Sequence, residues 1–309
     1  MHSQYRRLTF LVWQTCLLTV GLGAQDVPRS ASAPPITTHA CSLPGLTTGA
    51  DSFGDAQLLT AYNAQADRVR SLQAYAMVRG EAGKNVGQPA KKQAGKLAAT
   101  IQFQAPAMLR VTGVIPFSDR EIDMASNGRE FRLLVPVERD MRFLVGSVDA
   151  SADSPNPKEN LRPQPLIDAL HWPKGTSTGE MGARPPNIAG RILSIQLPAV
   201  KGVQRTAQIE FDLQSGTVSS LSIYAPGARL LWVIRYSDWE EVANQAIGAV
   251  AGCYPRRIAL VLSQQDFQLD MRILNLDLNP QIPTAHFLLN PPKGVPVVKL
   301  SSSGAKGAP

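Results

Sequence analysis

The stretch that decides the fold is Phe103–Val137, FQAPAMLRVTGVIPFSDREIDMASNGREFRLLVPV. Apolar residues recur at every second position in three segments of it, at 109 and 111, at 122 and 124, and at 131, 133 and 135. A period of two residues places alternate side chains on opposite faces of a strand, so each segment predicts a half-buried strand. Ser126-Asn127-Gly128 separates two of the segments and is typical of a tight turn. The stretch therefore predicts consecutive antiparallel strands.

The same alternation continues on both sides of this stretch. Further alternating segments begin near residues 97, 141, 190, 209, 221, 230, 258 and 267, and short turns join most of them. Such spacing indicates an antiparallel meander of about eleven strands that folds into a sandwich or barrel. The fold class is therefore mainly β with a few helices (α+β).

Two segments predict helices. Between Asp55 and Ser71 the apolar positions 58, 59, 62, 66 and 69 recur at steps of three and four residues, which is typical of an amphipathic helix. Pro165–Trp172 is a short apolar segment after a long polar loop. A curled sheet with only two helices buries its concave face best when the helices cover it.

The N-terminus predicts export. Residues 2–24 contain Arg6 and Arg7, an apolar stretch and then small residues, which is the order of a signal peptide cleaved near Gly23 or Ala24. An uncleaved anchor is the alternative, but the apolar stretch is short and Gln14 interrupts it. Residues 25–50 are rich in Pro, Ser and Thr and predict a flexible spacer, residues 51–300 form the folded domain, and residues 301–309 predict a disordered tail.

The cysteines leave two alternatives open. Cys41 is either acylated, as in bacterial lipoproteins, or bonded to Cys253 in the oxidising compartment that export implies. Acylation needs a Cys directly after the apolar stretch, and Cys16 lies inside that stretch.

No motif predicts catalysis or a cofactor. The sequence contains no G-x-S-x-G, G-x-x-x-x-G-K or G-x-G-x-x-G motif, and four His and three Cys are too few and too scattered for a zinc cluster. We therefore expect a non-enzymatic protein without metal or cofactor, and an envelope hydrolase is the least favoured alternative.

A basic hairpin tip is a candidate contact surface. Its lysines lie in a Gly- and Gln-rich turn and are Lys84, Lys91, Lys92 and Lys96. Such charges keep a sheet edge soluble, or they contact anionic head groups or an acidic partner. Nucleic acid is not an expected partner of an exported chain.

A strongly curved sheet of about eleven strands has a concave face that side chains alone do not fill, so part of it predicts an apolar pocket. An acyl chain suits such a pocket, because its burial contributes about 0.8 kcal/mol per CH₂ group. The inward positions expected to line the pocket are Ile101, Phe103, Leu109, Val111, Phe131, Leu133, Phe143, Val145, Trp232 and Ile234. The residues expected to form the lid are Leu166, Leu170 and Trp172.

Several local motifs resemble one family. The segments APAMLRVTG from Ala105, SNGREFRLLVP from Ser126 and YPRRIAL from Tyr254, together with the order of elements, resemble the bacterial lipoprotein-localisation carriers and receptors LolA and LolB over about residues 55–290. The resemblance implies an unclosed β half-barrel lidded by helices, with an apolar cavity that receives lipoprotein acyl chains. It also implies a location in the periplasm or on the periplasmic face of the outer membrane.

Two hypotheses follow. The first is a non-catalytic periplasmic carrier or receptor that binds lipoprotein acyl chains or other lipids and meets the inner leaflet of the outer membrane. We expect it to be a monomer. The sequence has no acylation motif directly after the leader, so the carrier form is favoured over the membrane-attached receptor. The second hypothesis is a cell-envelope scaffold or sensor domain of the same fold that binds a protein partner.

Overall fold

The computed structural model describes residues 41–46, 53–82, 95–114, 121–137, 140–148, 150, 157–177, 190–199, 203–243, 250–263 and 267–300. They belong to one compact unit, His39–Pro309. The expected signal peptide and tail lie outside the described residues, as do Lys84, Lys91 and Lys92.

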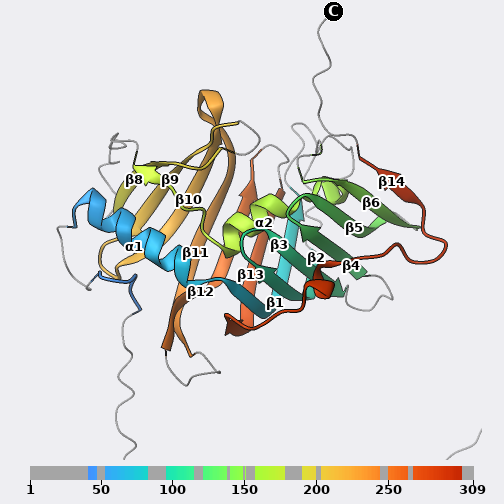
Figure 1. Ribbon diagram of the computed structural model, residues 1–309, viewed down its shortest axis with the longest axis horizontal. Coiled ribbons are helices and arrows are strands. Elements are labelled where there is room, and N and C mark those ends of the chain that lie inside the picture. The colour runs from blue at the N-terminus through green and yellow to red at the C-terminus, as the bar shows by residue number, and fades with distance from the viewer. Residues whose placement is uncertain are drawn as a thin grey trace, which may run out of the picture. The chain divides into compact units, whose positions relative to one another are not determined.

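The unit is built on a single sheet (Figure 1). Its strands are β1 (Ser71–Ala82), β2 (Gly95–Gln104), β3 (Met108–Val114), β4 (Glu121–Asn127), β5 (Glu130–Val137), β6 (Asp140–Ser147), β7 (Thr176–Ser177), β8 (Gly190–Gln196), β9 (Thr206–Asp212), β10 (Thr217–Ala225), β11 (Arg229–Ala243), β12 (Val250–Leu262), β13 (Phe267–Leu278) and β14 (Val297–Lys299). They are ordered β14-β6-β5-β4-β3-β2-β1-β13-β12-β11-β10-β9-β8-β7. All neighbours pair antiparallel except β14 with β6, which are parallel.

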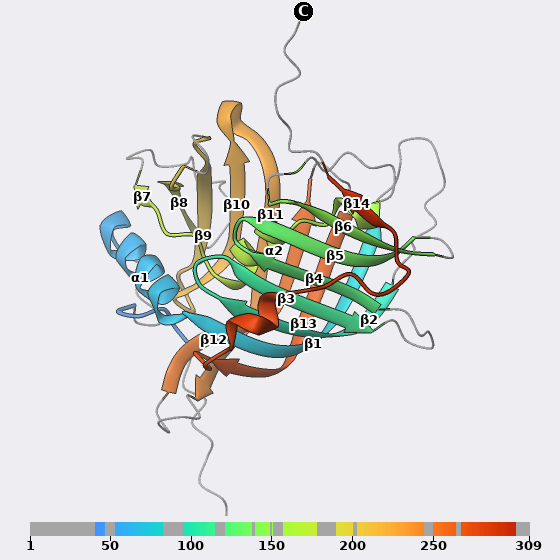
Figure 2. The same ribbon diagram turned by 45° about the vertical axis from the view of Figure 1, so that its right-hand side comes forward.

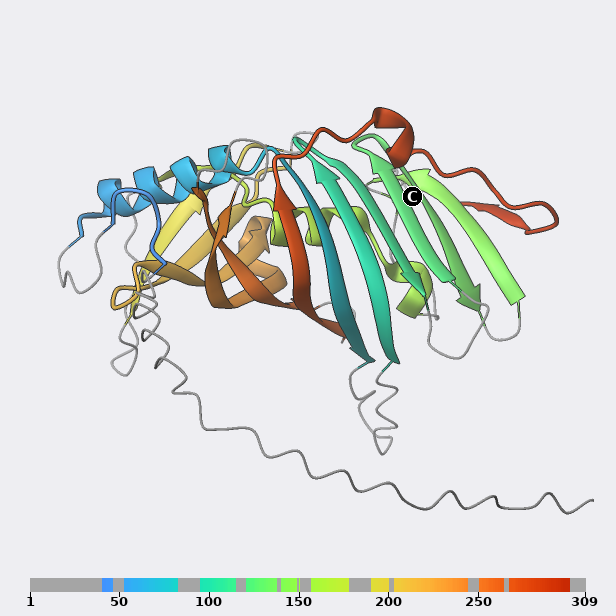
Figure 3. The same ribbon diagram turned by 90° about the horizontal axis from the view of Figure 1, so that it is seen from below.

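The expected fold class is confirmed, with a different number of strands. The sheet is curved (Figure 3), and within the described residues no pairing joins its edge strands β7 and β14, so it is unclosed. It has 14 strands rather than about eleven. The expectation omitted β1, and it omitted β7 and β14, which have only two and three residues.

Two helices cover the concave face of the sheet (Figures 1 and 3). They are α1 (Asp55–Arg68) and α2 (Pro163–Leu170), and three short 3₁₀ helices, η1 (Pro157–Asn160), η2 (Pro226–Ala228) and η3 (Thr284–Phe287), lie in connections. Leu58, Tyr62 and Ala66 form the buried face of α1, as their spacing predicts. Pro163 begins α2 at a position where the missing N–H costs nothing.

The C-terminal strap, residues 280–300, crosses the opposite face of the sheet (Figures 2 and 3). Arg110 donates hydrogen bonds to the carbonyl oxygens of His286 and Leu288, and Arg132 donates to that of Leu289. Leu289 is buried against Phe143 in a small apolar cluster separate from the main core. The strap then adds β14 to the edge of the sheet beside β6.

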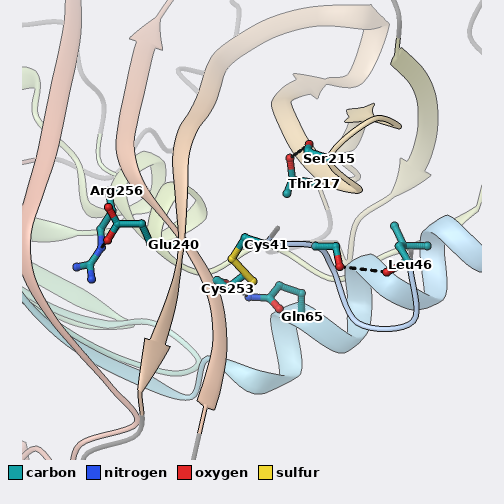
Figure 4. The surroundings of a disulfide bond; sticks show 9 residues. Cys41, Leu46, Gln65, Ser215, Thr217, Glu240, Cys253 and Arg256 are labelled. Carbon is teal, nitrogen blue, oxygen red and sulfur yellow. Dashed lines mark hydrogen bonds and ion pairs between the residues drawn. A yellow bond between two sulfur atoms is a disulfide. The ribbon is translucent and has the colours of Figure 1, made fainter. Parts of the chain in front are cut away.

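Residues 41–46 form a disulfide-bonded clasp (Figure 4). Cys41 is bonded to Cys253 of β12 with a Cα–Cα distance of 5.7 Å, so the alternative of an acylated Cys41 does not apply. The N–H of Leu43 donates to the carbonyl of Gly216 at 2.8 Å, and Leu43 and Leu46 are both buried in the core. These six residues lie within the segment expected to be a spacer, yet the disulfide and the two leucines fix them to the domain.

Among the described residues, none of the helices is long and apolar enough to cross a membrane.

Candidate functional site

An apolar pocket of about 410 Å³ lies on the concave face, between five adjacent strands and α2 with the segment that leads into it. The strands are β4, β3, β2, β1 and β13, which are consecutive in the sheet. The lining residues are Val78, Gly80, Gly95, Lys96, Leu97, Ile101, Val111, Gly113, Ile122, Met124, Leu161, Leu166, Leu170, Phe267, Leu269 and Met271. Its volume falls within the range of about 300–1,000 Å³ that is usual for small-molecule sites.

The register of the sheet assembles this lining. Ile101 of β2 pairs directly with Val111 of β3, and Val111 pairs with Met124 of β4. Because directly opposite residues project to the same face, these three side chains form one continuous row. On the other side of β2, Leu97 lies opposite Val78. The pocket floor is therefore an apolar surface set by strand register.

Glycines widen the pocket at one end. Gly80 and Gly95 lie directly opposite each other near the end of the β1–β2 hairpin. A Cβ atom at Gly95 would contact no described atom within 4 Å, and one at Gly80 would lie 3.2 Å from the ring of Phe267. Because neither member of the Gly80–Gly95 pair has a side chain, this end of the pocket stays open, and a larger residue at either position would fill part of it.

The structure brings together some of the expected site residues. Ile101 and Val111, the lid residues Leu166 and Leu170, and the expected contact residue Lys96 all line the pocket. The other inward residues belong to the packed core or to its margin and do not line the pocket: Phe103, Leu109, Phe131, Leu133, Trp232, Ile234 and Trp172. Leu133 and Phe103 are completely buried.

Phe143 and Val145 face the other way. Phe143 pairs with Leu134 and packs beneath the C-terminal strap, and Val145 packs against the same cluster. Leu144 of β6, opposite Leu133, faces the main core instead. The physical reason is that residues 143–145 are all apolar, so their alternation does not distinguish the two faces, and a shift of one residue inverts every side chain.

Several residues that line the pocket are not among those that the sequence predicts for it. Ile122, Met124, Phe267, Leu269 and Met271 lie in strands that the sequence predicts, and their alternation is visible. Val78 lies in the strand that the sequence analysis did not predict. No pattern in the sequence indicates which part of the concave face the helices leave uncovered.

Tyrosine hydroxyls hold the C-terminal end of α2. Tyr254 donates to the carbonyl of Leu170 at 2.8 Å, and Tyr62 donates to that of Pro173 at 3.1 Å. The Tyr62 ring stacks on Trp172 with centroids 5.4 Å apart. Helix carbonyls at this end have no partners within the helix, so the bond to Leu170 satisfies one of them, and the bond to Pro173 fixes the segment that follows the helix. The lid helix is thus anchored at the end next to the core.

A buried ion pair lies on the other side of α2. Asp168 accepts hydrogen bonds from Arg205 at 3.1 Å and Gln164 at 2.7 Å, and Asp168 and Arg205 are 3% and 11% exposed. Burial raises the pKa of Asp168, and the charge of Arg205 opposes that rise. Neither residue lines the pocket. The ion pair instead holds α2 to Arg205, the residue directly before β9.

The site offers no constellation for acid–base or metal chemistry among the described residues. Lys96 is the titratable residue of the described lining. His171 stacks on Phe103 with centroids 5.1 Å apart, and burial lowers its pKa. No group of three or more His, Cys, Asp or Glu that could hold a metal ion occurs in the described part of the chain.

An unclosed, curved antiparallel sheet with an apolar pocket under a helical lid defines a half-barrel protein with an internal apolar cavity. No family model matches the chain, and no curated protein is similar to it at a significant level.

Solved structures are similar to it at low identity. They include a domain provisionally described as an outer membrane lipoprotein-sorting protein from Vibrio parahaemolyticus (8% identity, 76% of this chain and 97% of that chain, TM-score 0.47). A LolA superfamily protein from Nitrosomonas europaea shares 14% identity over 77% of this chain and 99% of that chain (TM-score 0.45). A DUF1329 family protein from Desulfovibrio piger shares 13% identity over 76% and 95% (TM-score 0.45). Two of the three are named for lipoprotein sorting or for the family that the sequence resembles.

Proposed function

We propose that this chain is a non-catalytic carrier or receptor that binds an acyl chain of a lipoprotein or another lipid in its apolar pocket, for transfer to the outer membrane. The observation that carries the proposal is the pocket itself, whose lining is almost entirely aliphatic, aromatic and glycine residues. A packed core of this size has no reason to leave about 410 Å³ of apolar space unfilled, because empty apolar volume costs stability.

The free energy gained by burying an acyl chain is large enough to support binding. Burying a chain of ten methylene groups contributes about 8 kcal/mol before the cost of association is subtracted. That corresponds to reversible binding, which suits a protein that must both accept and release its ligand.

The disulfide supports the proposed location. Disulfides persist in exported proteins and are rare in the cytosol, so the Cys41–Cys253 bond fits the periplasm that the N-terminal segment predicts. The three lysines of the hairpin tip outside the described residues stay proposed contacts for an anionic membrane surface.

The first experiment is native mass spectrometry of the protein purified gently from the periplasm. Bound masses that match lipids or an acylated peptide are the expected result. A mass without ligand, together with no uptake of added lipid, would contradict the carrier function and favour the scaffold or sensor alternative.

A variant that fills the pocket tests the site. Gly95 shares the inward side of β2 with Leu97 and Ile101, and a Cβ atom there meets no described atom within 4 Å, so Gly95→Leu directs a side chain into the pocket. We expect about tenfold weaker binding of a fluorescent fatty acid and an unchanged melting temperature, since a strand position gains rather than loses packing. Thr100→Leu, on the outer side of the same strand, is the matched control and should bind as the wild type does. Equal binding by Gly95→Leu and Thr100→Leu would place the ligand elsewhere.

A further inference from the structure

Among the described lining residues, one is charged and lies at the end of the pocket. The charges around this residue indicate which chemical group it could bind. Among the described lining residues, Lys96 carries the charge, and it lies next to the open Gly80–Gly95 rung. A long lysine side chain packs its stem along apolar surface and keeps its ammonium in water. Lys96 is exposed, which agrees with that arrangement.

Lys96 also lines a second hollow, of about 510 Å³, on the outer face of the sheet. Both hollows are lined by Val78 and Lys96, so they approach the same end of the β1–β2 hairpin from opposite sides. The outer hollow contains the apolar side chains Met77 and Leu274, which are 37% and 45% exposed.

The strand register places four positively charged side chains close together around the outer hollow. Lys96 lies directly opposite Arg79, and Arg272 lies directly opposite Arg257. Like charges that face each other across two strands destabilise a sheet unless a counterion separates them. The two like-charged pairs lie on neighbouring rungs, because Arg272 is also opposite Met77.

The carboxylates near Lys96 already have other partners. Glu81 accepts from Arg79 at 2.8 Å and from Gln268 at 2.7 Å. Asp270 accepts two hydrogen bonds from Arg257, at 3.1 and 2.7 Å. Asp238 lines the outer hollow as well, but among the described residues no carboxylate, Asp238 included, forms an ion pair within 4 Å of Lys96.

We propose that the ligand of the pocket is a single acyl chain that ends in an anionic group, a carboxylate or a phosphate, and that Lys96 binds this group at the rim. The inference rests on the proposed function, and it narrows the ligand class from any acyl chain to an anionic amphiphile. The chain occupies the apolar pocket, and the anion supplies Lys96 with a counterion, since Glu81 already pairs with Arg79.

The test compares two ligands that differ only in charge. Binding of dodecanoate and of methyl dodecanoate to the purified protein is measured by titration calorimetry, for the wild type, Lys96→Met and Lys96→Arg. Lys293→Met, on the exposed C-terminal strap, is the control for loss of one positive charge. We expect the wild type to prefer the acid about fivefold, as one charge near a lipid head group provides.

The expected pattern has three parts. Lys96→Met loses the preference by weakening the acid alone, Lys96→Arg retains it, and Lys293→Met leaves it unchanged. Raising the salt concentration from about 0.05 to about 0.5 M reduces the wild-type preference, because an exposed ion pair is screened.

The test separates a failure of the anionic-group proposal from a failure of the proposed function. If the acid and the ester bind equally to the wild type and Lys96→Met changes neither, the inference about the anionic group is wrong and the acyl pocket stands. If neither ligand binds to the wild type, the proposed function itself fails. Carboxylate preference without preference for dodecyl phosphate over dodecanol would restrict the ligand to fatty acids and keep the inference.

Discussion

At the scale of the residue, Asp168 shows how the lid helix depends on one charge pair. The carboxyl is almost completely buried, and burial raises its pKa above that of an exposed carboxyl. The folded state therefore holds the proton more tightly than the unfolded chain does. It follows that this group's contribution to stability is greatest at low pH and is lost as the pH rises through the raised pKa, and that Arg205 reduces the loss.

Removing Arg205 exposes this dependence. We expect Arg205→Met to lower the free energy of unfolding by about 3–5 kcal/mol near neutral pH, because it leaves a buried charge without a partner. The loss should shrink at acid pH, because Asp168 takes up a proton as the pH falls through its raised pKa and then no longer needs a cation. Urea unfolding at both pH values measures the difference.

Arg256→Met is the control for this variant. Arg256 pairs with Glu240 at 2.9 Å, but Glu240 is 60% exposed, so the loss of that pair should cost at most about 1 kcal/mol at either pH. A cost for Arg205→Met that is equally small, or that does not change with pH, would show that Asp168 does not depend on its partner.

At the scale of the element, the C-terminal strap covers an apolar surface that the sheet would otherwise expose. Ala125, Leu134 and Phe143 project to the outer face, and Leu289 buries them. The strap has little secondary structure of its own, so side-chain bonds from Arg110 and Arg132 and the insertion of Leu289 hold it.

Two adjacent leucines test the strap. Leu289 is 7% exposed, and Leu288 is 59% exposed. We expect Leu289→Ser to destabilise the protein by about 2–4 kcal/mol, through lost burial and a cavity, and Leu288→Ser to change stability by less than about 0.5 kcal/mol. Thermal unfolding of the pair measures the contrast, and equal melting temperatures would mean that the strap does not contribute to the fold.

The elements also show how far the sequence predicts the structure. The strands from β2 to β5 and both helices follow from clear periodicity, as at Leu109 and Val111. Strand β1 was missed because its inward positions include the small residues Ala74 and Ala76 while Tyr75 and Met77 face outward, so the alternation of hydrophobicity is inverted. Pocket and core residues were not separated, since both are apolar and inward, and only the placement of α2 distinguishes Ile101 from Phe103.

At the scale of the whole molecule, the disulfide joins Cys41, at the start of the described chain, to Cys253 of β12. It closes a loop of 212 residues and fixes the clasp that buries Leu43 and Leu46. A crosslink over so long a loop restricts the unfolded chain strongly, in the chain-entropy account.

We therefore expect Cys41→Ser/Cys253→Ser to lose about 5 kcal/mol of stability. Chemical unfolding of the double variant, with and without a reducing agent, measures the loss. The wild type in reducing agent should match the double variant, and the double variant should not respond to the reducing agent. A double variant as stable as the oxidised wild type would contradict this role of the bond.

The unclosed sheet has a consequence for how copies of the protein meet. Free backbone N–H and C=O groups at a sheet edge recruit strands from other chains, and a sheet that does not close has two such edges. Here the edge strands are β7, with two residues, and β14, with three, and β14 ends in Lys299. Short edge strands and a lysine at the edge are devices by which natural sheets discourage edge-to-edge pairing, so these edges limit the self-association that leads towards fibrils while the pocket stays open.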